Sequence, residues 1–165
     1  MDINLIPSGT DCLIDANVVI YFLTNASPDC VNFFDRIAQE DLVGYLTTTI
    51  IAETLHRRMM MEAQAKGLVT PGKALAKLKA QPSLILQLTD YINEMAFLLR
   101  LPLDVLTATP VDIALSHSLR TSHGLFVNDS INLACAQVYG IRDIVSRDTD
   151  LQRVPTITVW EPTDI

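Results

Sequence analysis

Four acidic residues stand where an α/β chain can place chemistry. Asp15 ends a short apolar run, Asp148 lies just past the end of a predicted strand, and Glu53 and Asp129 each lie in the first turns of a run with helical spacing. Parallel strands present their carboxyl ends at one edge of a sheet, so these acids are expected to converge there. Crowded carboxylates repel each other, and a divalent cation removes that penalty. Hard oxygen ligands suit Mg²⁺ or Mn²⁺, which can polarise a phosphodiester and lower the pKa of a bound water.

Each of these acids also has an ordinary structural explanation. A role as a helix cap is enough to explain Asp15, and Glu53 can be an exposed helix residue. Asp129 near a helix start can simply complement the helix dipole. Asp148 can be a turn residue, and this explanation is stronger still for Asp150. Each explanation is reasonable alone, but it is improbable that all of them hold in one chain. The five acids together therefore favour an acidic site.

The elements that must position these acids alternate between strands and helices. Such alternation indicates βαβ units, and we expect a three-layer α/β/α sandwich with a mainly parallel sheet of four to five strands. A helical arm is expected at about 68–101. The strands are predicted at 11–15, 42–46, 103–106, 141–146 and, as a final edge strand, 156–160.

Several helix boundaries can be predicted from capping residues. Ser27, Thr70 and Thr109 each precede a proline, and this order is typical of a helix start. Asn128 is expected to cap the helix that carries Asp129. The spacing of apolar residues predicts one long amphipathic helix over 84–99.

Length and composition favour one globular domain over residues 1–165. No apolar run approaches the roughly 20 residues that a membrane-spanning helix needs. The chain begins with Met1 and Asp2, where a signal peptide would carry basic residues. Three cysteines form no C-x-x-C pair, so a reducing, cytoplasmic environment fits best.

The net charge of −7 argues against a general polyanion-binding protein, but the charge is unevenly distributed. Residues 54–80 hold six of the twelve Lys and Arg residues and only one acid, which gives this segment a net charge of +5. A solvated helical face explains such a segment, and so does a basic patch beside an acidic centre. The six cations are Arg57, Arg58, Lys66, Lys73, Lys77 and Lys79.

Four sequence blocks resemble the PIN domain, and in particular the VapC-type toxins of prokaryotic toxin–antitoxin pairs. The similarity spans about residues 11–161 in the right order. Two departures concern the segment 68–101, which is longer than usual, and Leu151, which stands where an aromatic residue is more common. The blocks are Leu13-Ile14-Asp15-Ala16-Asn17-Val18-Val19-Ile20, Thr48-Thr49-Ile50-Ile51-Ala52-Glu53-Thr54-Leu55, Asn128-Asp129-Ser130-Ile131-Asn132-Leu133-Ala134-Cys135-Ala136 and Val145-Ser146-Arg147-Asp148-Thr149-Asp150-Leu151.

The resemblance implies a metal-dependent endoribonuclease that cleaves single-stranded RNA, in which a metal-activated water attacks the scissile phosphate in line. It also implies an antitoxin protein that presents Arg or Lys to the acidic groove, and a homodimer. Asn17 and a threonine, Thr48 or Thr49, would orient ligands or water. The resemblance assigns Asp15, Glu53, Asp129 and Asp148 as the ligands of Mg²⁺ or Mn²⁺, with Asp150 as a helper.

Two other functions remain open from the sequence. A catalytically silent module of the same fold could bind RNA or protein, although such a module has no reason to keep four acids. A phosphate-handling hydrolase of the haloacid-dehalogenase type could use Asp15 as a nucleophile. That class requires a second aspartate two residues later, and this chain has Asn17 there.

Overall fold

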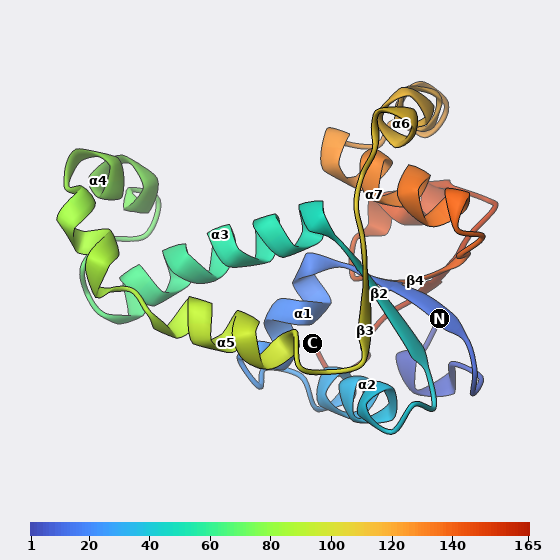
Figure 1. Ribbon diagram of the computed structural model, residues 1–165, viewed down its shortest axis with the longest axis horizontal. Helices are drawn as coiled ribbons and strands as arrows, with labels where there is room; N and C mark the ends of the chain where they lie inside the picture. Colours follow the sequence, from blue (N-terminus) through green and yellow to red (C-terminus); the bar gives the residue numbers. More distant parts are fainter.

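The computed structural model describes residues 1–165 and is built around a five-stranded sheet. All strand pairs are parallel, and the strand order is β3-β2-β1-β4-β5. Figure 1 shows helices on both sides of the sheet, with α2 on one side and α7 on the other. The expected three-layer α/β fold is therefore confirmed. The strands are β1 (Asp11–Ile14), β2 (Val43–Thr47), β3 (Leu103–Leu106), β4 (Asp143–Val145) and β5 (Thr158–Trp160).

The order of the strands places a topological switch point between β1 and β4. From the central β1 the chain builds one half of the sheet through β2 and β3, and it then returns to add β4 and β5 on the other side. In open α/β sheets, ligands bind outside the carboxyl ends of the strands at such a point. Asp15 directly follows β1 there, and Ser146 directly follows β4.

Helices cover the sheet and extend beyond it. None of them is both long and apolar enough to cross a membrane. The α-helices are α1 (Ala16–Leu23), α2 (Pro28–Ala38), α3 (Thr48–Ala65), α4 (Ala74–Ala80), α5 (Asp90–Leu98), α6 (Pro110–His123) and α7 (Val127–Val138), and the 3₁₀ helices are η1 (Ile3–Leu5), η2 (Pro82–Gln87) and η3 (Thr149–Arg153).

Of the four predicted helix starts, those at Ser27 and Thr109 are confirmed, and those at Asn128 and Thr70 are wrong. The Ser27 side chain accepts from the Cys30 N–H at the start of α2, and Thr109 forms a capping box with Asp112 in α6. In contrast, α7 is not capped by Asn128. It begins at Val127, two residues before the start that a cap at Asn128 would give, and it has no side-chain cap because its N-cap residue, Phe126, carries no polar side-chain atom.

The prediction of one continuous helix over 84–99 is also wrong. Residues 82–87 form the 3₁₀ helix η2, Leu88 is extended, and α5 starts only at Asp90. The physical reason is tertiary: the Glu62 carboxylate accepts the backbone N–H groups of Thr89 and Tyr91 and so caps α5 from another helix. A cap at this place ends any helical run that comes from residue 84.

A similar difference occurs at the start of α4. The Thr70-Pro71 pair predicts a helix start there, but α4 begins at Ala74. Gly72 has a φ of 76°, which is the left-handed conformation and cannot continue a right-handed helix. The residues after the proline therefore form a turn, and the helix follows that turn.

The helical arm that the sequence predicts is present and has its own small core. We define the arm as residues 62–98, which comprise the end of α3 with α4, η2 and α5. The main core contains 30 buried residues around the sheet, whereas a separate cluster of five lies within the arm. Figure 1 shows α4 at the far end of α3, away from the sheet. The five residues of the arm cluster are Ala63, Val69, Ala74, Leu78 and Leu88.

Candidate active site

Asp15 is fixed in place at the point where β1 becomes α1. One carboxylate oxygen accepts the Ala16 N–H at 2.6 Å, so Asp15 is the N-cap of α1, as its ordinary structural explanation requires. The other oxygen accepts from the Ser146 hydroxyl at 2.6 Å and from the Asn17 amide at 2.5 Å. The cap role and a site role are therefore compatible, because two further donors orient the carboxylate across the switch point.

Ser146 is a central residue of this network that the sequence reasoning missed. Its buried hydroxyl donates to Asp15 and accepts the Asp148 N–H at 2.9 Å, so it ties the end of β1 to the loop after β4. Asn17 adds a second link through its carbonyl oxygen, which accepts the Arg147 N–H at 3.3 Å. The signal for Ser146 in the sequence is its place two residues before Asp148, at the end of a strand.

Asp129 projects from the first turn of α7 and has an unusual titration. Burial and the nearby charges of Asp15, Asp148 and Glu53, in that order, raise the pKa of Asp129 to about 6. The pKa of Asp15 is raised as well, first by burial and then, against the lowering effect of Ser146, by Glu53 and Asp148. These carboxylates are therefore close enough to act on one another through their charge.

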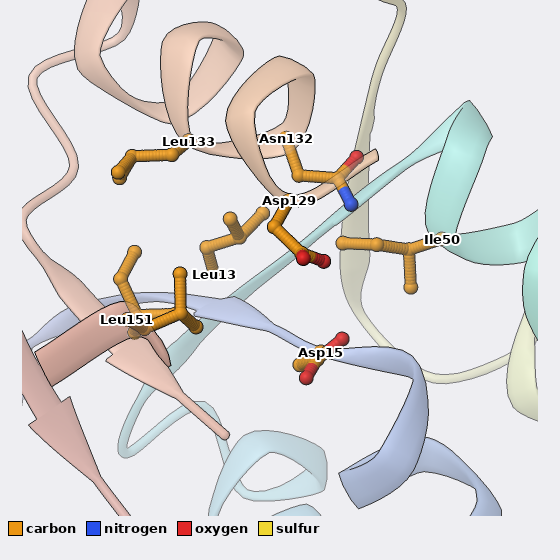
Figure 2. Close-up of a pocket in the computed structure, with 8 residues that line it drawn as sticks. Leu13, Asp15, Ile50, Asp129, Asn132, Leu133 and Leu151 are labelled. Carbon is orange, nitrogen blue, oxygen red and sulfur yellow. The ribbon is translucent and has the colours of Figure 1, made fainter. Parts of the chain in front are cut away.

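Asp15 and Asp129 line the same pocket. Figure 2 shows their carboxylates facing each other across it, with Asn132 and Ile50 beside them. The pocket has a volume of about 20 Å³, which is enough for one water-sized species. Leu151 also lines the pocket.

A buried threonine fixes the orientation of Asn132 in this pocket. The Thr47 hydroxyl accepts the Ile50 N–H at 3.0 Å and donates its single hydrogen to the Asn132 carbonyl oxygen at 2.6 Å. The Asn132 amide group is therefore left as a donor on the pocket side. The family resemblance implies that Thr48 or Thr49 orients ligands or water. In the structure Thr48 is exposed, and the hydroxyl that caps α3 and bonds to Asn132 in the pocket wall belongs to Thr47.

The remaining predicted acids surround the pocket without lining it. Glu53 lies in α3 and makes a long contact of 3.5 Å with Arg57. Asp148 caps η3 by accepting the Asp150 N–H at 2.8 Å. Asp150 pairs with Arg153 at 2.6 Å. The structure thus brings Asp15 and Asp129 together and leaves the other three acids around them as a source of negative potential.

The donor set fits a hard divalent cation only in part. No group of three or more His, Cys, Asp or Glu side chains has the arrangement that would hold a metal ion. Mg²⁺, however, usually keeps several waters and takes only one or two protein carboxylates. Asp15 and Asp129, which face each other across one pocket, meet that smaller requirement.

Comparison with protein families identifies the class of protein. The family model for the PIN domain matches residues 12–157, which is most of the chain, so this chain belongs to the PIN domain family. A comparison with curated protein sequences finds no match.

Solved structures with the same fold include VapBC and VapC proteins. The chain is similar to VapBC2 of Rickettsia felis, solved bound to a promoter DNA fragment, with 13% identity and a TM-score of 0.62 over 93% of this chain and 99% of that one. It is also similar to the sarcin-ricin loop cleaving toxin VapC20 of Mycobacterium tuberculosis, with 11% identity and a TM-score of 0.57 over 88% and 96%. FitAcB of Neisseria gonorrhoeae gives 20% identity and a TM-score of 0.52 over 93% and 99%. At these identities the likeness concerns the fold alone.

Proposed function

We propose that this chain is a divalent-metal-dependent endoribonuclease that cleaves single-stranded RNA, and that it is the toxin of a toxin–antitoxin pair. The observation that carries the proposal is the pair of carboxylates, Asp15 and Asp129, which face each other at the switch point of the sheet with raised pKa values. Strongly perturbed carboxyls in a pocket are typical of functional sites. The toxins with the same fold support the choice of reaction.

In this proposal, Asp15 and Asp129 would hold Mg²⁺ or Mn²⁺, which when bound would supply polarisation of the phosphodiester and a bound water of lowered pKa. Glu53 and Asp148 would assist in holding the cation, and Asp150 would add negative potential. Ser146 and Asn17 hold Asp15 in position, so that its carboxylate does not have to reorganise when the cation arrives.

The proposal includes partners. A cognate antitoxin that presents Arg or Lys to the acids would block the site by charge-assisted hydrogen bonds. We propose in addition that the chain forms one domain, acts in the cytoplasm and works as a homodimer. Light scattering on the purified chain measures its oligomeric state directly.

The test of the function is cleavage of a pool of unstructured single-stranded RNA with Mg²⁺ or Mn²⁺. We expect cleavage that EDTA stops and that an Asp15→Asn, Asp129→Asn double variant lacks. An Asp104→Asn variant is the matched control, because Asp104 is an exposed acid in the sheet away from the pocket. A folded wild-type protein that cuts no RNA with either metal contradicts the proposal and favours a binding module.

Ser146 allows a separate prediction about metal affinity. Changing Ser146 to alanine removes one of the two side-chain donors to Asp15, so we expect the affinity for Mn²⁺ to fall about 10–100-fold. Calorimetric titration with Mn²⁺ measures this without any RNA. Ser118→Ala is the control, because the Ser118 hydroxyl is exposed and bonds only to its own helix. Equal Mn²⁺ affinity in the Ser146 variant and wild type would show that the hydroxyl does not position the ligand.

A further inference from the structure

The arm carries a charge pattern that the acidic site does not explain. Residues 63–89 contain four lysines and no acid, in a chain whose net charge is −7. Of the six cations in the segment 54–80, some hold the arm together and the others do not. The ion pairs of the structure separate the two groups.

Three of the six cations already have partners. Arg58 makes two hydrogen bonds to the Glu94 carboxylate, at 2.7 and 2.6 Å, and so joins α3 to α5. Lys66 contacts Glu62 at 2.5 Å and Asp90 at 3.2 Å. Arg57 makes the long contact with Glu53 in its own helix. These three side chains are part of the structure of the arm and its base.

The other three, Lys73, Lys77 and Lys79, are exposed and form no ion pair. Lys73 immediately precedes α4, and the other two lie within it. The opposite side of α4 is fixed, because Ala74 and Leu78 are buried in the arm cluster. Lys73 and Lys77, four residues apart at the start of α4, are therefore neighbours at the end of the arm, whereas Lys79, two residues after Lys77, projects from another side of the helix. The neighbouring sequence contains no acid to neutralise these three charges.

The position of this lysine group relative to the pocket suits a long substrate. Glu53 and Ala65 are separated by about 18 Å of helix, at 1.5 Å per residue, and α4 follows beyond that end of α3 (Figure 1). A substrate that bound only at the pocket would meet mainly carboxylates, because the nearby Arg57 and Arg153 are already paired with Glu53 and Asp150. A strand of RNA that reached from the pocket along α3 would meet three cations at its far part.

We propose that Lys73, Lys77 and Lys79 bind the phosphates of a single-stranded RNA several nucleotides away from the scissile bond. The inference rests on the proposed function and names the second point at which the substrate is held. Charge complementarity carries it, because an acidic protein with an acidic pocket needs a separate cationic surface to attract a polyanion. The arm then contributes binding energy and direction, and the pocket contributes the chemistry.

The test measures how RNA affinity depends on salt. The protein is the full chain with Asp129→Asn to prevent cleavage, and the probe is a fluorescein-labelled, unstructured RNA. Neutralising all three lysines with glutamine should make the slope of log K against log salt shallower by about 2, because each lost contact to a single strand contributes about 0.7. With Asp129 restored and Mg²⁺ present, the same three changes should raise KM and leave kcat unchanged.

Two controls separate charge from other effects. Lys73→Arg, Lys77→Arg, Lys79→Arg keeps all three charges and should keep the wild-type slope. Arg142→Gln removes one exposed charge just before β4, at the opposite edge of the sheet from the pocket, and should change little. All substituted side chains are exposed, and glutamine and arginine are both good helix formers, so the variants should fold.

The outcomes distinguish the inference from the proposed function. If wild type cleaves RNA but the glutamine variant keeps its slope and KM, the arm inference is wrong and the function stands. If wild type never cleaves RNA, the proposed function fails, and the salt slope still reports whether the arm binds RNA. An unchanged RNA slope together with lysine-dependent binding of poly-glutamate would assign the surface to an acidic protein instead.

Discussion

Replacing Asp129 with asparagine is expected to stabilise the metal-free protein while it abolishes the reaction. The pKa of Asp129 is about 6, against an ordinary value of 3.8, so ionisation of this carboxyl at neutral pH works against folding. One pKa unit corresponds to about 1.4 kcal/mol, and the partial exposure of the side chain reduces the effect, so we expect a gain of about 1–2 kcal/mol. In EDTA at neutral pH, the melting temperature should rise by about 3–6 °C.

The pH dependence of this gain follows from the direction of the shift. Because the folded-state pKa is raised, wild type loses stability as pH rises from about 4 through about 6, and the asparagine variant does not. The advantage of the variant should therefore vanish below about pH 4. A melting temperature equal to that of wild type at neutral pH would mean that the carboxylates around the pocket do not strain the fold.

Added metal should make the melting temperature of wild type higher than that of the Asp129→Asn variant. A cation relieves the repulsion between the carboxylates of wild type. At pH values above 6, Mn²⁺ should therefore raise the melting temperature of wild type and change that of the asparagine variant much less. Cleavage by the variant should fall at least about hundredfold. Asp112→Asn is the matched control on the neighbouring helix. Hydrogen bonds from Thr109 lower the pKa of Asp112, so its replacement should destabilise the protein.

Glu62→Gln is expected to loosen the arm and to leave the sheet intact. Burial alone would raise the pKa of Glu62, but hydrogen bonds from Lys66 and the Tyr91 N–H outweigh it and lower this pKa to about 2. Glu62 is 4% exposed, so its charge is buried with its partners. The shift of about 2.5 units corresponds to about 3 kcal/mol, which the glutamine variant largely loses.

Hydrogen exchange measures this loss where it occurs. The backbone N–H groups of Thr89 and Tyr91 donate hydrogen bonds to the Glu62 carboxylate. Their amide protons should exchange about a hundredfold faster in the variant, whereas those of β1 should keep their protection. In wild type the stabilisation is present above about pH 4.5 and is lost as pH falls towards about 2. Glu40→Gln is an exposed control. Slow exchange at Thr89 in the Glu62 variant would show that the carboxylate is not what starts α5.

The features of the fold that depend on local sequence could be predicted, and those that depend on distant contacts could not. Alternating strands and helices predict the parallel sheet, and Ser27 and Thr109 predict two helix starts, because a cap acts within a few residues. The break before α5 was missed, since its cause is Glu62, which lies in another helix. No local pattern reports a cap that arrives from 27 residues away.

The same distinction applies to the candidate site. Asp15 and Asp129 were predicted to meet because strand order brings the ends of β1 and the start of α7 to one edge, and they do line one pocket. Ser146 was missed because its role is a hydrogen bond to Asp15 across 131 residues. The choice between Thr47 and Thr48 depends on the first turn of α3, which the triplet of threonines leaves undetermined.

The pairing of β1 with β4 has a consequence for the synthesis of the chain. Residues 12–14 leave the ribosome about 130 residues before their partners, residues 143–145. Until Ser146 has emerged, Asp15 lacks the hydroxyl that orients it, and the central strand has an open edge. A nascent chain therefore has no assembled pocket until residue 146 has emerged. If the chain is the nuclease proposed above, its site would not be assembled, and it would not cut RNA near the ribosome that makes it, before that point.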